Sequence, residues 1–212
     1  MTAPGDEAYT GEHPVVFTVD YPADPRNRVT VFFRIFTVLP IAVVFMTVSG
    51  AYPSWGGAGG AGAAGGLLFL GPLLMILFRQ KYPRWWFDWN LNLLRFENRV
   101  AAYLLLLRDD YPATDAEQAV HLRIPYPDAS RLNRWLPLVK WFLAIPHYVV
   151  LIFLDIGMVV AVVVGWFAVL ATGRLPQVLF DYVVGVLRWS NRVIAYAFLL
   201  STDSYPPFRL GP

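Results

Sequence analysis

One segment of this chain occurs twice, and this repeat limits the fold more than any other feature of the sequence. Residues 83–107 recur at 176–200, and a Tyr-Pro pair follows each copy, with one extra residue before it in the second copy. The positions of the first copy that are identical 93 residues later are Pro83, Phe87, Asp88, Leu94, Arg95, Asn98, Arg99, Val100, Ala102, Tyr103, Leu106 and Leu107. The repeat predicts a tandem duplication, with a disordered polar tail at 1–14, a first unit at 15–113 and a second at 114–212.

The composition indicates a membrane protein. Hydrophobic residues make up 57% of the chain, charged residues only 15%, and the mean hydropathy is +0.47. Such values are typical of chains that cross a bilayer several times rather than of soluble domains of this length. Cysteine is absent, which excludes disulfides, thiolate metal sites and thiol nucleophiles. Residues 1–31 carry several acidic groups and no apolar run, so we expect no cleaved signal peptide there.

Four apolar segments are long enough to enter a bilayer, at 32–49, 62–78, 135–154 and 157–171. We expect them to form two transmembrane hairpins, with a Gly/Ala-rich loop at 50–66 and a tight turn at 155–157. The second and fourth segments are at or below the length of a full crossing. Neither connection contains Lys or Arg. The positive-inside rule therefore predicts a multi-pass membrane protein with both termini in the cytoplasm. Of the 17 basic residues 15 are Arg, a bias typical of GC-rich bacterial genomes, so we expect this membrane to be the bacterial plasma membrane.

One short strand-like run precedes the first apolar segment of each unit. Residues 15–19 and 120–124 are rich in β-branched side chains, and each run is followed by a Tyr-Pro pair. A single strand is unstable in water. We therefore expect the two runs to pair on the cytoplasmic side and to relate the units by a twofold axis along the membrane normal. The predicted fold class is mainly α, with this small strand pair.

The repeated segments are predicted to be amphipathic helices that lie at the membrane interface. Each carries charges at positions i, i+7 and i+11, which fall within about 20° of one line on a helix. The residues of this stripe are Asp88, Arg95 and Arg99 in the first copy and Asp181, Arg188 and Arg192 in the second. The arginines are candidates for holding lipid phosphates. The alternative is that the aspartates and arginines pair internally, because an unpaired charge in lipid is costly.

The second copy resembles a bacterial membrane family known only as a domain of unknown function, number 4389. The resemblance rests on the motifs at 173–176, 180–181, 185–189, 191–196 and 199–208. The first copy departs from it, with Phe96 in place of a tryptophan and Asn92 in place of Gly185. The resemblance implies a bacterial integral membrane protein and brings with it no activity and no catalytic residues.

No pattern in the chain predicts catalysis. His13, His121 and His147 lie in dissimilar contexts without metal-binding spacing, and no nucleotide-binding or hydrolase motif occurs in a suitable setting. We therefore expect no catalytic residue, metal or cofactor. The expected function is that of a non-enzymatic accessory or scaffold protein that organises lipid or a membrane complex. The alternatives are a small two-repeat transporter or channel and, third, an enzyme acting on lipids.

The expected partners follow from the same observations. They are membrane lipids, anionic ones among them, and either a membrane-protein partner or a second copy of the chain. Nucleic acid is not expected, because the basic residues flank the predicted membrane segments instead of forming a free patch.

Overall fold

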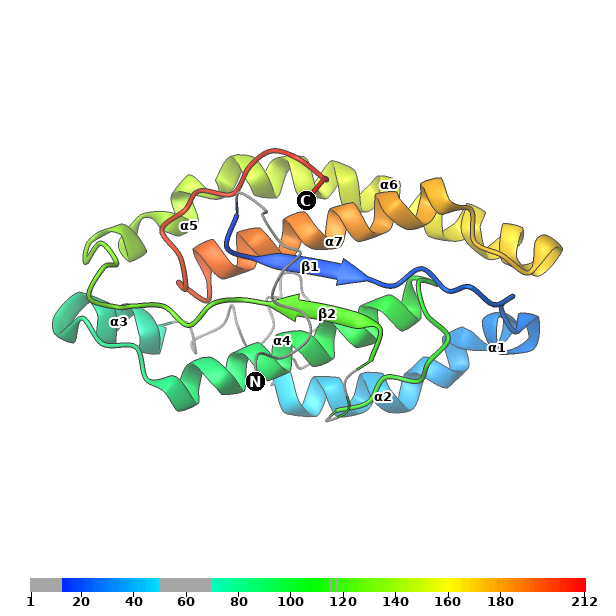
Figure 1. The fold of residues 1–212 in the computed structure, drawn as a ribbon, viewed down its shortest axis with the longest axis horizontal. Helices are drawn as coiled ribbons and strands as arrows, with labels where there is room; N and C mark the ends of the chain where they lie inside the picture. Colours follow the sequence, from blue (N-terminus) through cyan, green and yellow to red (C-terminus); the bar gives the residue numbers. More distant parts are fainter. Residues whose placement is uncertain (1–12, 50–69, 115, 117) are drawn as a thin grey trace, which may run out of the picture.

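A two-stranded sheet lies against a layer of helices, and both the strands and the long helices run along the long axis of the molecule (Figure 1). The computed structural model describes residues 13–49, 70–114, 116 and 118–212. The strands are β1 (Val16–Val19) and β2 (Val120–Arg123). The helices are α1 (Arg28–Phe32), α2 (Arg34–Ser49), α3 (Leu70–Arg79), α4 (Arg84–Leu104), the 3₁₀ helix η2 (Leu136–Leu138), α5 (Lys140–Leu143), α6 (Ile145–Thr172) and α7 (Gln177–Ala197). The chain is therefore mainly helical, as predicted.

The predicted strand pairing is confirmed. β1 and β2 form an antiparallel pair in which Phe17 lies opposite Leu122. These two residues correspond in the two units, since Leu122 follows Phe17 by the 105 positions that separate the strand-like runs. Their side chains are 1% and 3% exposed and point into the helix layer, because alternate residues of a strand face opposite sides. A pairing centred on corresponding residues is the arrangement that a local twofold axis produces.

The two repeated segments form the long helices α4 and α7, as predicted. Each starts directly after a proline, Pro83 or Pro176, whose missing N–H costs nothing at a helix start. The helices meet at Asn98 and Asn191, which exchange two hydrogen bonds. Asn98 Nδ2 donates to Asn191 Oδ1 at 2.9 Å, and Asn191 Nδ2 donates to Asn98 Oδ1 at 2.7 Å. Both side chains are buried, so this reciprocal amide pair satisfies polar groups at the centre of the molecule.

The prediction of a transmembrane hairpin in the second unit is wrong. A single helix, α6, runs through the expected turn at 155–157 and joins most of the two apolar segments into 28 residues. A glycine costs only about 1 kcal/mol inside a helix, and no proline stands there to break it. Gly157 instead permits close packing: a Cβ at this position would lie 2.5 Å from the Tyr182 hydroxyl of α7. Pro146 stands at the start of α6 and does not kink its interior.

The apolar helices of the first unit are shorter. α2 has 16 residues and α3 has 10. The predicted loop at 50–66 and the start of the segment at 62–78 lie outside the described residues. Within the described part of the chain, α6 alone is long and apolar enough to cross a membrane, judged by length and composition. Of the four predicted crossings, the described residues thus supply one candidate helix, and the multi-pass topology stays a prediction.

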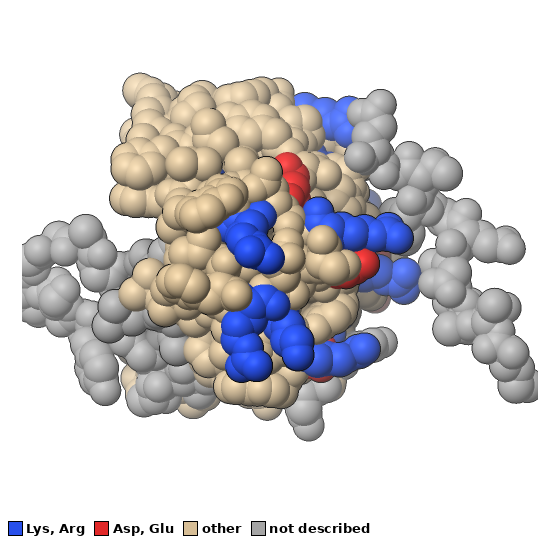
Figure 2. All heavy atoms as spheres, turned by 90° about the vertical axis from the view of Figure 1, so that its left-hand side faces the viewer, with Lys and Arg blue, Asp and Glu red and all other residues tan. Residues whose placement is uncertain are grey.

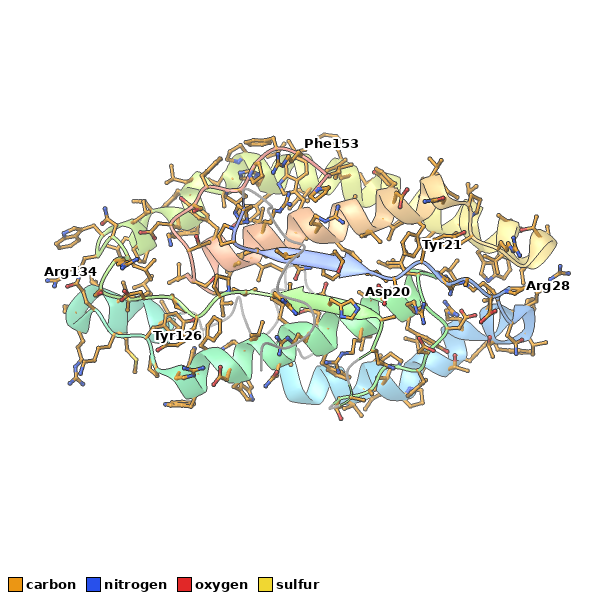
Figure 3. The ribbon with its side chains drawn as sticks, in the orientation of Figure 1. Asp20, Tyr21, Arg28, Tyr126, Arg134 and Phe153 are labelled. Atoms are coloured by element: carbon orange, nitrogen blue, oxygen red, sulfur yellow. The ribbon has the colours of Figure 1, made fainter. Side chains whose placement is uncertain are left out.

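The outer side of α6 is covered by none of the segments that the structure describes. Only 17% of its most apolar 18-residue window is buried. Exposed apolar residues recur every three or four positions along it, among them Val149, Phe153, Ile156, Val160 and Val163. Figure 3 shows Phe153 directed away from the strand pair. The opposite side of the helix packs against α7 through residues such as Leu151.

Candidate functional site

The arginines of the charged stripe on α4 and α7 face the strand layer. Arg95 Nε donates to the carbonyl of Leu122 at 3.1 Å, and Arg188 Nε donates to the carbonyl of Phe17 at 3.0 Å. These carbonyls belong to the central pair of the sheet, and each arginine comes from the helix beneath its strand. The two corresponding arginines therefore fasten the strands to the helix layer in the same way.

The outer arginines of the stripe bind chain segments that lie beside the strands. Arg99 Nη1 donates to the carbonyl of Ala113 at 2.6 Å, and Arg192 Nη1 donates to the carbonyl of Gly211 at 3.0 Å. Burial lowers the pKa of Arg192 to about 10, and the nearby charges of Arg188 and Arg209 act in the same direction. These arginines thus hold down the segment before β2 and the end of the chain.

The two aspartates of the stripe lie at the surface. Asp88 is 3.8 Å from Arg84, and both side chains are more than half exposed. No ion pair of Asp181 is found among the described residues. Burial lowers the pKa of Arg188, and the charge of Asp181 opposes this effect without direct contact. The structure therefore brings the arginines to backbone carbonyls and does not join them to Asp88 or Asp181.

A polar pocket of about 480 Å³ opens beside the first-unit arginines. Arg95 and Arg99 line it together with the exposed strand residues His121 and Arg123. The pocket has the charge for an anion, although the two stripe arginines already bind carbonyls. The lipid-phosphate hypothesis for the stripe stays a prediction.

Buried ion pairs that the sequence reasoning missed lie near the C-terminal ends of α4 and α7. Lys140 is 0% exposed, and its Nζ lies 2.7 Å from Asp203 and donates to the carbonyl of Thr202 at 2.7 Å. In the first unit, Arg34 is 2% exposed and pairs with Asp109. Burial lowers the pKa of Lys140, and its bond to Asp203 opposes that effect. Removing one partner would leave a buried charge without compensation.

The two buried pairs share further details. The Arg34 guanidinium lies 4.6 Å from the ring centre of Tyr103, and Lys140 Nζ lies 5.1 Å from that of Tyr196. Tyr103 and Tyr196 are repeat partners. The sequence contained a signal for the carboxylates as well, because Asp109 and the corresponding acid of the second unit both stand two residues before a repeated Tyr-Pro pair.

The second-unit histidine, His147, is enclosed by aromatic rings. Its ring is 0% exposed and lies 4.0 Å, centre to centre, from that of Phe208, in a stacked arrangement. Trp189 Nε1 donates to His147 Nδ1 at 3.0 Å. Within the described residues, no group of three or more His, Asp or Glu is arranged to hold a metal ion. His147 therefore packs the joint between α6, α7 and the end of the chain.

The comparisons with known proteins concern the second unit. Residues 135–209 match the model of a family described as a domain of unknown function (DUF4389). The resemblance inferred from the sequence is thus confirmed over these residues, which include Lys140, Arg188, Arg192 and Asp203. The match does not extend into the first unit. Neither a curated protein nor a solved structure matches the chain.

Proposed function

We propose that this chain is a non-enzymatic scaffold of the bacterial plasma membrane, built from two copies of one unit, that organises lipid around its helix layer. The single observation that carries the proposal is the uncovered outer side of α6, a 28-residue apolar helix. An apolar face of this length needs a cover, and lipid or a membrane partner is the cover that it fits. The exposed apolar residues of α2 and α3, such as Phe36 and Phe78, extend the same property to the first unit.

The distribution of charge supports an arrangement with the helix layer in lipid and the strand layer toward water. The strand layer carries exposed polar groups, including the Asp20 and His121 pair, whose atoms are 3.2 Å apart. α6 runs alongside α7 in the same general direction as the strands (Figure 1). If α6 crossed the membrane upright, this polar layer would stand within the bilayer. A helix layer that lies in the plane of the membrane avoids that cost.

Corresponding contacts support the duplication. Besides the arginine and amide contacts, Tyr21 Oη donates to the carbonyl of Leu175 at 2.7 Å, and the Tyr126 hydroxyl donates to the carbonyl of Tyr82. Each tyrosine thus reaches from the segment after its strand to the start of the other unit's long helix. The backbone also has a positive φ at Gln80 and at Gly173, 93 positions apart.

Membrane fractionation of cells that produce Val163→Lys tests the proposal. Wild type is expected to stay in the membrane pellet after an alkaline carbonate wash, and the variant is expected to be released to a large extent. The reason is that Val163 is 51% exposed on α6, where a lysine would place its charge against lipid and weaken membrane binding by up to about 3 kcal/mol. His121→Lys, which adds a charge on the exposed strand face, is the matched control and should remain membrane-bound. Release of wild type by carbonate would contradict the proposal.

Organisation of lipid needs its own measurement. Wild type solubilised from native membranes is expected to carry a reproducible set of lipids, identified by mass spectrometry, with no chemical change in them during incubation. Turnover of a bound lipid would favour an enzyme. Uptake of ions or solutes into vesicles that contain the purified protein would favour a transporter.

A further inference from the structure

The end of the molecule formed by α3, η2 and α5 carries a basic cluster that the scaffold role alone does not explain. Figure 2 views the molecule from this end and shows Lys and Arg side chains gathered beside a broad surface without charge. The exposed basic residues of this end are Arg79, Lys81, Arg84, Arg131 and Arg134. Asp128 and Asp88 each pair with one of them, so the cluster keeps a positive charge.

In the described part of the chain the opposite end has no such cluster, although the sequence repeat relates the two ends. The residues 93 positions after Arg79 and Arg84 are Thr172 and Gln177, which are uncharged. The counterpart of Arg131 is Arg26, which is buried and bound to Asp109. Among the residues that the structure describes, Arg28 and Arg174 are the exposed bases at that end. Two units with the same residues would give both ends the same basic side chains. The cluster is therefore a specialisation of the α3 end.

A pocket of about 770 Å³ lies within this cluster. The end of α3 and residues 80–83 form one wall, and residues 126–130 form the other, so both units build it. Its floor is fixed: the Tyr82 side chain is 4% exposed, and its hydroxyl donates to the carbonyl of Leu199 at 2.7 Å. Arg134 Nη2 donates to Gln80 Oε1 at 2.7 Å and steadies the turn after α3.

Two cationic side chains of the pocket wall are available to bind a ligand. Within the part of the chain that the structure describes, the side chains of Arg79 and Lys81 make no ion pair and no hydrogen bond. The wall becomes apolar one turn earlier on α3, where Met75 lines the pocket and is 39% exposed. Phe78, at 74% exposure, continues this surface. A basic wall that passes directly into an exposed apolar one matches a molecule with an anionic head and a hydrocarbon tail.

We propose that this pocket binds the phosphate headgroup of an anionic phospholipid, with Arg79 and Lys81 as its ligands and the acyl chains along α3. The proposal rests on the proposed membrane location. Trp85 and Trp135, 68% and 67% exposed at the same end, stand where interfacial tryptophans accompany headgroups. The site differs from the arginine stripe, whose side chains are occupied by backbone carbonyls.

Calorimetric titration of the purified full chain in neutral detergent with dioctanoyl phosphatidylglycerol tests the site. Each basic residue near anionic lipid strengthens binding about fivefold. Arg79→Gln combined with Lys81→Gln is therefore expected to weaken binding about 25-fold. The matched control, Arg28→Gln with Arg174→Gln, removes the same charge from the opposite end and should change binding less than threefold.

Three outcomes would overturn the assignment. Equal losses in both double variants would mean attraction by overall charge, and unchanged binding in both would place the lipid elsewhere. Inorganic phosphate that binds as tightly as the lipid, with the same loss in the pocket variant, would make this a site for a soluble anion. None of these results touches the proposed membrane location, because the pocket variant is expected to remain in the carbonate-washed membrane pellet with wild type.

Discussion

Corresponding residues of the two units perform the same task where they meet at the centre and diverge toward the ends. Arg95 and Arg188 hold corresponding carbonyls of the two strands. At the ion pairs, Arg34 and Lys140 differ in type but bind a corresponding aspartate. At the ends, Arg26 turns inward, whereas Arg131 stays exposed. A change in one member of such a central contact is expected to disturb both predicted units, because the contact joins them.

The reciprocal pair of Asn98 and Asn191 provides a test at this scale. Asn98→Leu is expected to lower the free energy of unfolding by about 1–3 kcal/mol, because the side-chain amide oxygen of Asn191 (Oδ1) then loses its hydrogen-bond donor inside the protein. Asn191→Leu should cost a similar amount. The double change should cost clearly less than the sum, since no buried amide is left unpaired. Thermal unfolding of the four proteins in one detergent measures this, and additive losses would show that the amides act independently.

At the scale of the elements, the sequence predicted a helix or strand correctly wherever its pattern was compatible with one structure only. The runs at 15–19 and 120–124 had to find strand partners, and they pair with each other. The segments beginning at Pro83 and Pro176 had an apolar periodicity and a start signal, and both are helices. These predictions depended on local physics, namely propensity and the need to satisfy backbone hydrogen bonds.

The prediction of a hairpin in the second unit failed because the sequence signal for its turn at 155–157 was ambiguous. Asp155 and Gly157 are frequent in turns, but neither prevents a helix, and the apolar residues on both sides favour one. The site residues illustrate a second limit. The stripe of Arg95 and Arg99 was visible from spacing, but their carbonyl partners lie 27 and 14 residues away, and periodicity cannot reveal such contacts. The buried pair of Lys140 and Asp203 spans 63 positions, and although the repeat marks Asp203, only the structure shows that it contacts Lys140.

Gly157 and Tyr182 test the packing of α6 on α7. Tyr182 Oη donates to the carbonyl of Leu154 at 2.9 Å, and a Cβ on Gly157 would lie 2.5 Å from that hydroxyl but 3.4 Å from the ring carbon that bears it. Gly157→Ala alone should therefore fail to stabilise the protein, because the alanine displaces the hydroxyl and breaks the hydrogen bond. In a Tyr182→Phe background the same change should stabilise by about 1 kcal/mol, the usual gain of alanine over glycine in a helix.

Thermal unfolding of Gly157→Ala, Tyr182→Phe and the double variant supplies the comparison. A stabilising effect of equal size in both backgrounds would mean that α6 and α7 do not approach at Gly157. A helix broken at 155–157, as a hairpin requires, would lose stability on the same change in both backgrounds if Gly157 adopted a positive φ there.

For the whole molecule, the proposed membrane location allows two orientations of the long axis, along the membrane normal or in the plane of the membrane. Basic residues occur at both ends of that axis, and Figure 3 shows Arg28 and Arg134 at opposite ends. An upright α6 would put these two residues on different sides of the membrane. Its 28 residues would span about 42 Å, enough to cross a hydrocarbon core of about 30 Å. With the helix layer in the membrane plane, both residues lie on the same side, together with the strand pair.

The absence of cysteine makes this distinction measurable without background. We expect cysteines introduced singly at Arg28, Arg134 and His121 to share one labelling behaviour toward a membrane-impermeant thiol reagent in intact cells, because all three then belong to the water-facing side. Each side chain is exposed, so poor access within the fold does not limit the reaction. Labelling of all three in opened vesicles is the control for reactivity. A cysteine at Arg28 that reacts in intact cells while one at Arg134 stays protected, or the reverse, would establish a crossing by α6. In that case the polar strand layer would need a second polar surface to cover it within the bilayer.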